Sequence, residues 1–259
     1  MKKLFEKILE WLRFLFKQEP EPVEIIEAES GETEEETTEE IETNDMEENN
    51  TVNSYKLRIL LDNGHASSTP GKRSPKEEGV DQFFEYEFNR DIVRRIAEKL
   101  SGLGVQYEIL VPEVDEDVPL MKRAERANKF CDEYGVDKCF FLSVHANAAG
   151  NGSSWTKANG WSCYTSRGYT TSDDFAEIFM NEAAEILIPM GRNIRKYSQS
   201  KQSWEDNFTV LAKTKCPAVL TENLFYDNKG DLQFLRSEEG REALAQIHVN
   251  AILKIEAQA

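Results

Sequence analysis

The chain alternates between short apolar runs and longer segments in which apolar residues recur every three or four positions. The short runs are typical of buried strands, whereas the periodic segments predict amphipathic helices. Strands that alternate with helices along a chain indicate an α/β fold in which helices pack on a sheet. The predicted strands are 58–62, 105–111, 139–145 and 218–222, and the predicted helices are 84–100, 120–134, 173–188 and 238–255.

Residues 1–17 have a different pattern, a broad apolar face beside basic side chains, which predicts an amphipathic helix. Charged residues such as Glu6 and Arg13 interrupt the apolar run, so the segment is a poor export signal. It is also too short and too charged to span a bilayer. We expect this helix to dock on a membrane surface or to self-associate, and the pattern favours neither. With no recognisable signal peptide, synthesis in the cytoplasm is expected.

Residues 18–53 account for most of the net charge of −17. This stretch contains fifteen acidic residues, no basic residue and few large apolar ones. Such a composition cannot bury enough apolar surface to offset the entropy of ordering the chain, and it predicts a disordered acidic linker. The remaining residues, 54–259, fit one globular domain. They contain no basic patch or nucleic-acid motif, so no nucleic-acid partner is expected.

Histidine is rare in this chain, and two of its three copies lie at the ends of predicted strands. His65 follows the first strand and His145 ends the third. In open α/β sheets the groups beyond the carboxyl ends of the strands gather at one edge, so these two imidazoles are predicted to lie close together. His248 falls on the C-terminal helix, and we interpret it as a hydrogen-bonded structural residue.

A third candidate lies on the helix predicted over 84–100. At 100° per residue Glu85 falls within the apolar stripe of this helix, whereas Glu87 points the opposite way. A carboxylate on a buried face is costly unless it is neutralised, and Arg90 lies on the other face. We therefore expect Glu85 to have a cation as partner. The alternative is a carboxylate held by the amides of the first helical turn.

Two imidazoles and one carboxylate with an open fourth position form the ligand set of catalytic zinc hydrolases. His65, Glu85 and His145 therefore predict one Zn²⁺ ion that activates water and polarises a carbonyl. Such a reaction needs a base, and Glu222 is the candidate because it ends an apolar strand at the same edge. Glu222 could instead be a fourth ligand or a group that orients a histidine.

Five segments along residues 57–256 resemble the motifs of zinc-dependent N-acetylmuramoyl-L-alanine amidases, a family of bacterial cell-wall hydrolases and phage endolysins. These segments are LLDNGH, EYEFN, AERAN, FLSVHANA and PAVLTENLFYDN. The resemblance implies that 54–259 is a catalytic domain with a twisted, mostly parallel sheet flanked by helices. It implies zinc ligands at His65, Glu85 and His145 and a catalytic Glu222. The implied substrate is peptidoglycan, at the amide between the muramic acid lactyl group and L-alanine.

The motifs also include Asn147, which is predicted to bind substrate, and Arg126, for which packing is the expected role. Asn63 and Ala66 depart from the family pattern, as does the loop 69–79. These departures concern loop shape and substrate contacts rather than zinc ligands.

The sequence favours a lytic, endolysin-like amidase that is released from the cytoplasm and acts on the cell wall, because no export signal is recognised. Two alternatives stay open. A zinc peptidase or carboxypeptidase acting on stem peptides would use the same ligands, since zinc and a base do not select among amides. A non-catalytic wall-binding module is disfavoured, because the predicted ligands and the predicted base are all present.

Overall fold

The computed structural model describes residues 55–259, which form an α/β fold around one six-stranded sheet. The strands are β1 (Arg58–Asn63), β2 (Gln106–Ile109), β3 (Cys139–Asn147), β4 (Ser162–Thr165), β5 (Trp204–Glu205) and β6 (Ala218–Phe225). The helices are α2 (Glu85–Leu103), α3 (Leu120–Tyr134), the 3₁₀ helix η1 (Val136–Lys138), α4 (Thr171–Leu187), α5 (Thr209–Lys213), α6 (Lys229–Arg236) and α7 (Glu238–Glu256).

The sheet is mixed but mostly parallel, with the strand order β2-β1-β3-β6-β4-β5. Pairing is parallel between β1 and both of its neighbours, between β3 and β6, and between β4 and β5. Only the β4–β6 pair is antiparallel. The predicted α/β fold with a mostly parallel sheet flanked by helices is confirmed.

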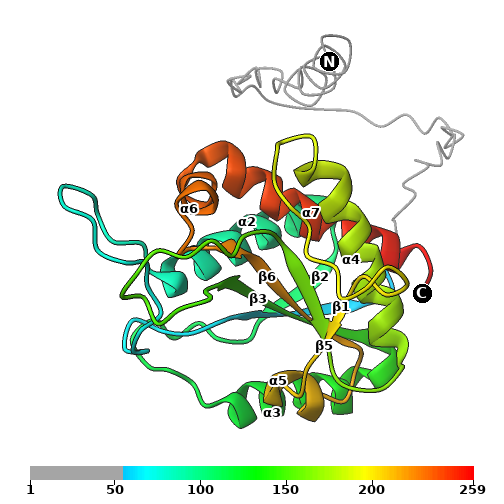
Figure 1. Ribbon diagram of the computed structural model, residues 1–259. Helices are drawn as coiled ribbons and strands as arrows, with labels where there is room; N and C mark the ends of the chain where they lie inside the picture. Colours follow the sequence, from blue (N-terminus) through cyan, green and yellow to red (C-terminus); the bar gives the residue numbers. More distant parts are fainter. Residues whose placement is uncertain (1–54) are drawn as a thin grey trace, which may run out of the picture. The chain divides into compact units, whose positions relative to one another are not determined.

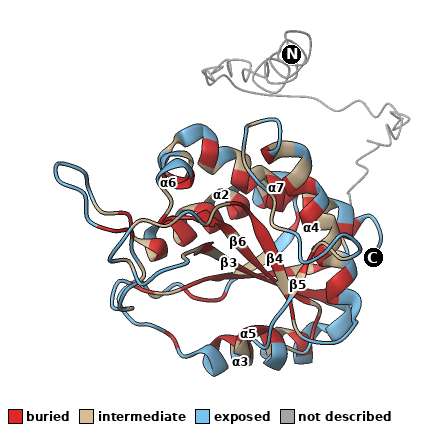
Figure 2. Cartoon of the chain, in the orientation of Figure 1, coloured by how far each residue is buried: buried red, intermediate tan, exposed pale blue. Residues whose placement is uncertain are grey.

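Helices cover both faces of this sheet (Figure 1). α2, α4, α6 and α7 lie over one face, and α3 and α5 lie over the other. The first layer buries a large apolar cluster that includes Phe88 and Ile252, and the second buries a smaller one that includes Phe141 and Val210. The strands between the layers are largely buried (Figure 2). Burial on both faces explains why the central strands read as nearly continuous apolar runs.

The four predicted helices are present, and α3 has the predicted bounds. The predicted buried strand over 105–111 was wrong, because β2 covers only Gln106–Ile109 and its four residues are exposed or half-buried. β2 lies at the edge of the sheet and pairs only with β1. The apolar signal came from Val105 and Val111, which flank the strand and are buried. The short elements β4, β5, α5 and α6 were not predicted.

The predicted amphipathic helix over 1–17 and the predicted linker over 18–53 lie outside the described residues. No helix within 55–259 combines the length and apolar character needed to cross a membrane.

Candidate active site

The carboxyl ends of β1, β3 and β6 lie side by side and carry the candidate residues. His145 pairs with Glu222 across the β3–β6 ladder, and a bulge follows between His145 and Asn147. Both strands therefore continue past these residues, so the prediction that His145 and Glu222 end their strands was wrong. The bulge and the left-handed φ of 64° at Leu224 bend the strand ends beside the site.

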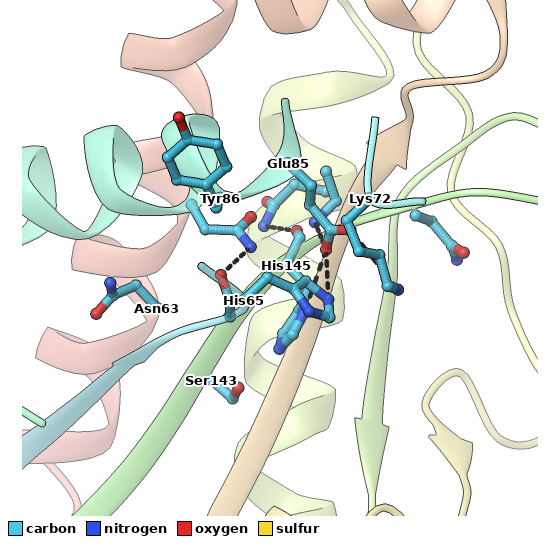
Figure 3. A network of polar contacts seen from close by, with 12 residues as sticks. Asn63, His65, Lys72, Glu85, Tyr86, Ser143 and His145 are labelled. Atoms are coloured by element: carbon cyan, nitrogen blue, oxygen red, sulfur yellow. Dashed lines mark hydrogen bonds and ion pairs between the residues drawn. The ribbon is translucent and has the colours of Figure 1, made fainter. Parts of the chain in front are cut away.

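His65, Glu85 and His145 come together as predicted, with one donor atom of each lying within 4.8 Å of the others. Glu85 Oε1 lies 3.2 Å from His145 Nδ1 and 3.4 Å from His65 Nε2. Figure 3 shows the Glu85 carboxylate meeting both imidazoles. In the part of the chain that the structure describes, this is the one cluster of histidine, cysteine and acidic side chains with metal-ligand spacing.

The loop after β1 places His65 in a left-handed conformation with φ of 64°. Few residues other than glycine adopt this conformation, so the loop must be held by its neighbours. Asn89 Nδ2 donates a hydrogen bond to the Gly64 carbonyl at 3.0 Å, and Arg90 donates one to the His65 carbonyl at 2.8 Å. Helix α2 thus fixes the backbone of a residue that the sequence places well before it.

Glu85 is the first residue of α2 and is 1 % exposed, as the helical pattern predicts. Glu87 points away from the site and is exposed, where it accepts a hydrogen bond from the Tyr86 hydroxyl. The backbone amide that donates to the Glu85 carboxylate belongs to Ala146 of β3, at 3.3 Å, and not to the first turn of α2. Burial opposes ionisation of Glu85, but the hydrogen bonds with His145 and His65 hold its pKa below the usual range.

Two contacts fix His145 that the sequence did not reveal. Asn223 Nδ2 donates a hydrogen bond to the His145 carbonyl at 2.9 Å, and Asn223 Oδ1 accepts one from Trp161 Nε1 at 2.8 Å. The His145 ring also packs directly on Gly64, which has no side chain to displace it. The imidazole is therefore held from the neighbouring strand and from the loop after β1.

Glu222 faces the same site from β6 and lines the same cavity of about 400 Å³ as His65 and His145. Its Oε2 atom is buried and has no hydrogen-bond partner among the described residues. Burial, together with the negative charge of Glu85, raises the pKa of Glu222 to about 8. A carboxyl group with this pKa can both accept and release a proton near neutral pH.

A buried ion pair in the wall of this cavity supports the end of β1. Arg123 of α3 is 2 % exposed and donates hydrogen bonds to Asp62 Oδ1 and to the Asn63 carbonyl, at 2.8 and 3.0 Å. Asp62 Oδ2 also accepts one from Ser143 at 2.6 Å. The motif residue named from the sequence was Arg126, not Arg123. Arg126 donates hydrogen bonds to Glu113 and to the Leu110 carbonyl, and it braces the segment after β2.

A second cavity of about 280 Å³ meets the first at Lys72 and Glu222, since both residues line both cavities. Asn147 lines this second cavity. The loop beyond Asn147 is held by Asp227, whose Oδ2 accepts hydrogen bonds from the amides of Ala149 and Gly150 at 2.9 and 2.8 Å.

The donor set fits a zinc ion. Zinc binds imidazole nitrogen and carboxylate oxygen at about 2.0–2.2 Å, so two donors on one tetrahedral ion lie roughly 3.4 Å apart. The Glu85 contacts of 3.2 and 3.4 Å to the two imidazoles match this separation, and all three donor atoms lie within 4.8 Å of one another. The buried Oε2 atoms of Glu85 and Glu222 have no hydrogen-bond partner among the described residues, which leaves carboxylate oxygens available to a cation or to water.

Known proteins resemble this chain in sequence. The endolysin of Bacillus phage SPP1 is 28% identical over 202 residues, a match that covers 76% of this chain and 65% of the endolysin. The N-acetylmuramoyl-L-alanine amidase CwlM of Bacillus licheniformis is 29% identical over 199 residues, covering 76% of this chain and 68% of that protein. The matched region thus spans about two thirds of the length of these relatives.

Solved structures share the fold. The N-acetylmuramoyl-L-alanine amidase from Clostridium difficile 630 superposes with a TM-score of 0.61 at 23% identity, covering 78% of this chain and 97% of that one. The amidase Ami1 from Mycobacterium smegmatis gives a TM-score of 0.62 at 21% identity, covering 79% and 99%. The model of the N-acetylmuramoyl-L-alanine amidase family matches residues 59–254, which include every candidate site residue. The chain belongs to the N-acetylmuramoyl-L-alanine amidase family.

Proposed function

We propose that this protein is a zinc-dependent amidase that cleaves peptidoglycan between N-acetylmuramic acid and L-alanine. The proposal is carried by the cluster of His65, Glu85 and His145, in which Glu85 lies 3.2 and 3.4 Å from the two imidazoles, close to the separation of two ligands on one tetrahedral zinc ion. Glu222 lies in the same cavity, its buried Oε2 has no hydrogen-bond partner among the described residues, and it is the proposed base. Membership of the family supports the choice of this amide as substrate.

Zinc in such a site supplies a Lewis acid that polarises the amide carbonyl and lowers the pKa of water. Glu222 takes a proton from the attacking water as the water oxygen adds to the carbonyl carbon of the lactyl group. The same carboxyl group returns a proton to the L-alanine nitrogen as the carbon–nitrogen bond breaks. The products are a lactyl carboxylate on the glycan and a stem peptide with a free amine.

Asn147 is the proposed substrate-binding residue. It lines the second cavity beside Glu222, and its carboxamide oxygen accepts a hydrogen bond from the Ala148 amide at 2.8 Å. This bond orients the carboxamide at the wall of the cavity, where it can meet polar groups of the glycan or the peptide.

The test is the zinc content of the purified full chain together with release of amines from peptidoglycan before and after chelation. The proposal expects about one zinc per chain and chelator-sensitive release of intact stem peptides with L-alanine amines. Loss of terminal D-alanine or cleavage within the stem would support a zinc peptidase instead. Absence of turnover with zinc restored would support a wall-binding module.

We further propose a lytic role, which the similarity to a phage endolysin supports. In this role the enzyme reaches the wall after release from the cytoplasm, and residues 1–17 contact a membrane surface or a second copy of the chain. Purified protein should then clear suspensions of permeabilised cells. Trimming of the wall without a fall in turbidity would contradict a lytic role.

A further inference from the structure

The two cavities of the site meet at one basic side chain, Lys72. Lys72 and Glu222 are the residues that line both cavities. The first cavity also contains Arg123, but this guanidinium is buried and bonded to Asp62, Asp117 and two backbone carbonyls. Lys72, by contrast, is 41% exposed and makes no side-chain hydrogen bond among the described residues. It is the cation of the two cavities that is available to a ligand.

The backbone of Lys72 is held against the start of α2, the helix that carries Glu85. The Lys72 carbonyl accepts a hydrogen bond from the Glu85 amide at 3.0 Å, and Arg73 forms a β-bridge with Phe84. The backbone of Lys72 is therefore held at the edge of the site although it belongs to a long loop, and its side chain lies beside Glu85 (Figure 3). A residue whose backbone is already held loses less entropy on binding a ligand than one on a free loop.

The only ion pair of Lys72 among the described residues is a loose one. Its Nζ atom lies 3.7 Å from Glu85 Oε2, beyond hydrogen-bond distance. The charge of Glu85 is already shared with two imidazoles and, in the proposed function, with zinc. Zinc would then compete with Lys72 for the charge of Glu85, and the ammonium group would be left to stabilise an anion of the substrate beside it.

The distance from Lys72 to the triad suits a group close to the scissile bond. Nζ lies 3.7 Å from Glu85 Oε2, and Glu85 Oε1 lies 3.2 Å from His145. A substrate amide bound at the triad would then lie roughly one to two residue lengths from the ammonium group, at about 3.5 Å per residue. In a stem peptide, that span reaches from the L-alanine nitrogen to the α-carboxyl group of the second residue.

We infer that Lys72 binds the free α-carboxylate of the second stem residue and makes the enzyme prefer acidic stems to amidated ones. This inference rests on the proposed function and adds a substrate preference to it. Lys72 acts as a specificity residue that contacts substrate, and it takes no part in the proton transfers of Glu222. The carboxamide of an amidated stem carries no charge and gains less from the ammonium group.

The test compares two N-acetylmuramoyl peptides that differ only in whether the α-carboxyl group of D-glutamate at the second position is free or amidated. The zinc-loaded full chain should cleave the acidic peptide with a kcat/KM roughly 5- to 10-fold higher, mainly through KM. Lys72→Met should reduce the preference to less than about 2-fold, and Lys72→Arg should keep it. Lys76→Met, on the exposed part of the same loop, should leave the kcat/KM for both peptides unchanged.

Equal cleavage of both peptides by the unmodified chain would overturn the inference while leaving the amidase activity intact. An equal loss of kcat on both peptides in Lys72→Met would also overturn it, because it would assign Lys72 to the reacting carbonyl. Binding of the released peptides, acidic and amidated, is measured separately by calorimetry and does not need turnover. A chain that cleaves neither peptide would contradict the proposed function, whereas tighter binding of the acidic peptide that is lost in Lys72→Met would still support the role of Lys72.

Discussion

Gly64→Ala should prevent zinc binding although it replaces none of the proposed ligands. The added Cβ would lie 2.0 Å from Cε1, 2.4 Å from Nδ1 and 2.5 Å from Nε2 of the His145 ring. Ordinary carbon contacts are about 3.5 Å, so the ring would have to move by roughly 1.5 Å. Zinc–ligand distances vary by only about 0.2 Å, so the displaced imidazole can no longer bind together with His65 and Glu85.

The expected loss of zinc affinity in Gly64→Ala exceeds roughly 100-fold, more than is typical when a group that merely orients a ligand is removed. Competition with a chromophoric chelator measures the affinity, and amine release from peptidoglycan measures the activity. The matched control is Gly102→Ala on α2, because no atom lies within 4 Å of the Cβ that it would add. Gly102→Ala should keep the zinc and raise the stability by about 0.5–1 kcal/mol.

A Gly64→Ala variant with unchanged zinc affinity and activity would refute this reasoning. The φ angle of Gly64, unlike that of its neighbour His65, lies outside the left-handed region, so alanine is not penalised by the backbone there. Any effect can therefore be assigned to the contact with His145. Circular dichroism separates loss of zinc from loss of the fold.

Glu222→Gln should keep the zinc and lose most of the turnover, measured as kcat on a muramoyl peptide, and near-normal kcat would remove Glu222 from the base role. Glu87→Ala should leave both zinc binding and kcat nearly unchanged, because Glu87 is exposed and points away from the triad. Loss of zinc in this variant would contradict the placement of Glu85 and Glu87 on opposite faces of α2. Arg123→Met should lower the free energy of unfolding by about 3 kcal/mol or more, because Asp62 would stay buried without its cation. Urea denaturation measures this change, and a loss below about 1 kcal/mol would contradict it. Burial lowers the pKa of His248 to about 4, and its ring is hydrogen-bonded to the Thr221 hydroxyl and the Leu244 carbonyl. The stability that the neutral imidazole contributes is therefore fully present above the unfolded pKa of about 6.5. This contribution to the free energy of unfolding, of the order of 3 kcal/mol, is lost as the pH drops from about 6.5 towards 4. Between pH 7 and pH 4.5, measured by urea denaturation, the free energy of unfolding should fall less in His248→Gln than in the unmodified chain. Equal falls would contradict the assignment of this pH dependence to His248.

The α/β fold could be predicted from the sequence because hydrophobic periodicity depends on local geometry. The stripe of α2 identified Glu85 as the buried carboxylate and Glu87 as the exposed one, and both assignments are confirmed. His248 is buried and hydrogen-bonded, as its position on the C-terminal helix indicated. Each of these predictions depends on which face of a single element a residue occupies.

Only the tertiary structure decided how the candidate residues are held and which neighbours support them. The contact of Gly64 with the His145 ring joins two segments far apart in the chain, and no periodicity encodes it. The same is true of Asn223, which fixes the His145 carbonyl from β6, and of Lys72, which the loop before α2 brings to the site. The sequence determined which side chains could bind zinc, because that depends on their chemistry. Their spacing depends on strand register, a bulge and a left-handed residue at position 65, which arise only when the elements pack together.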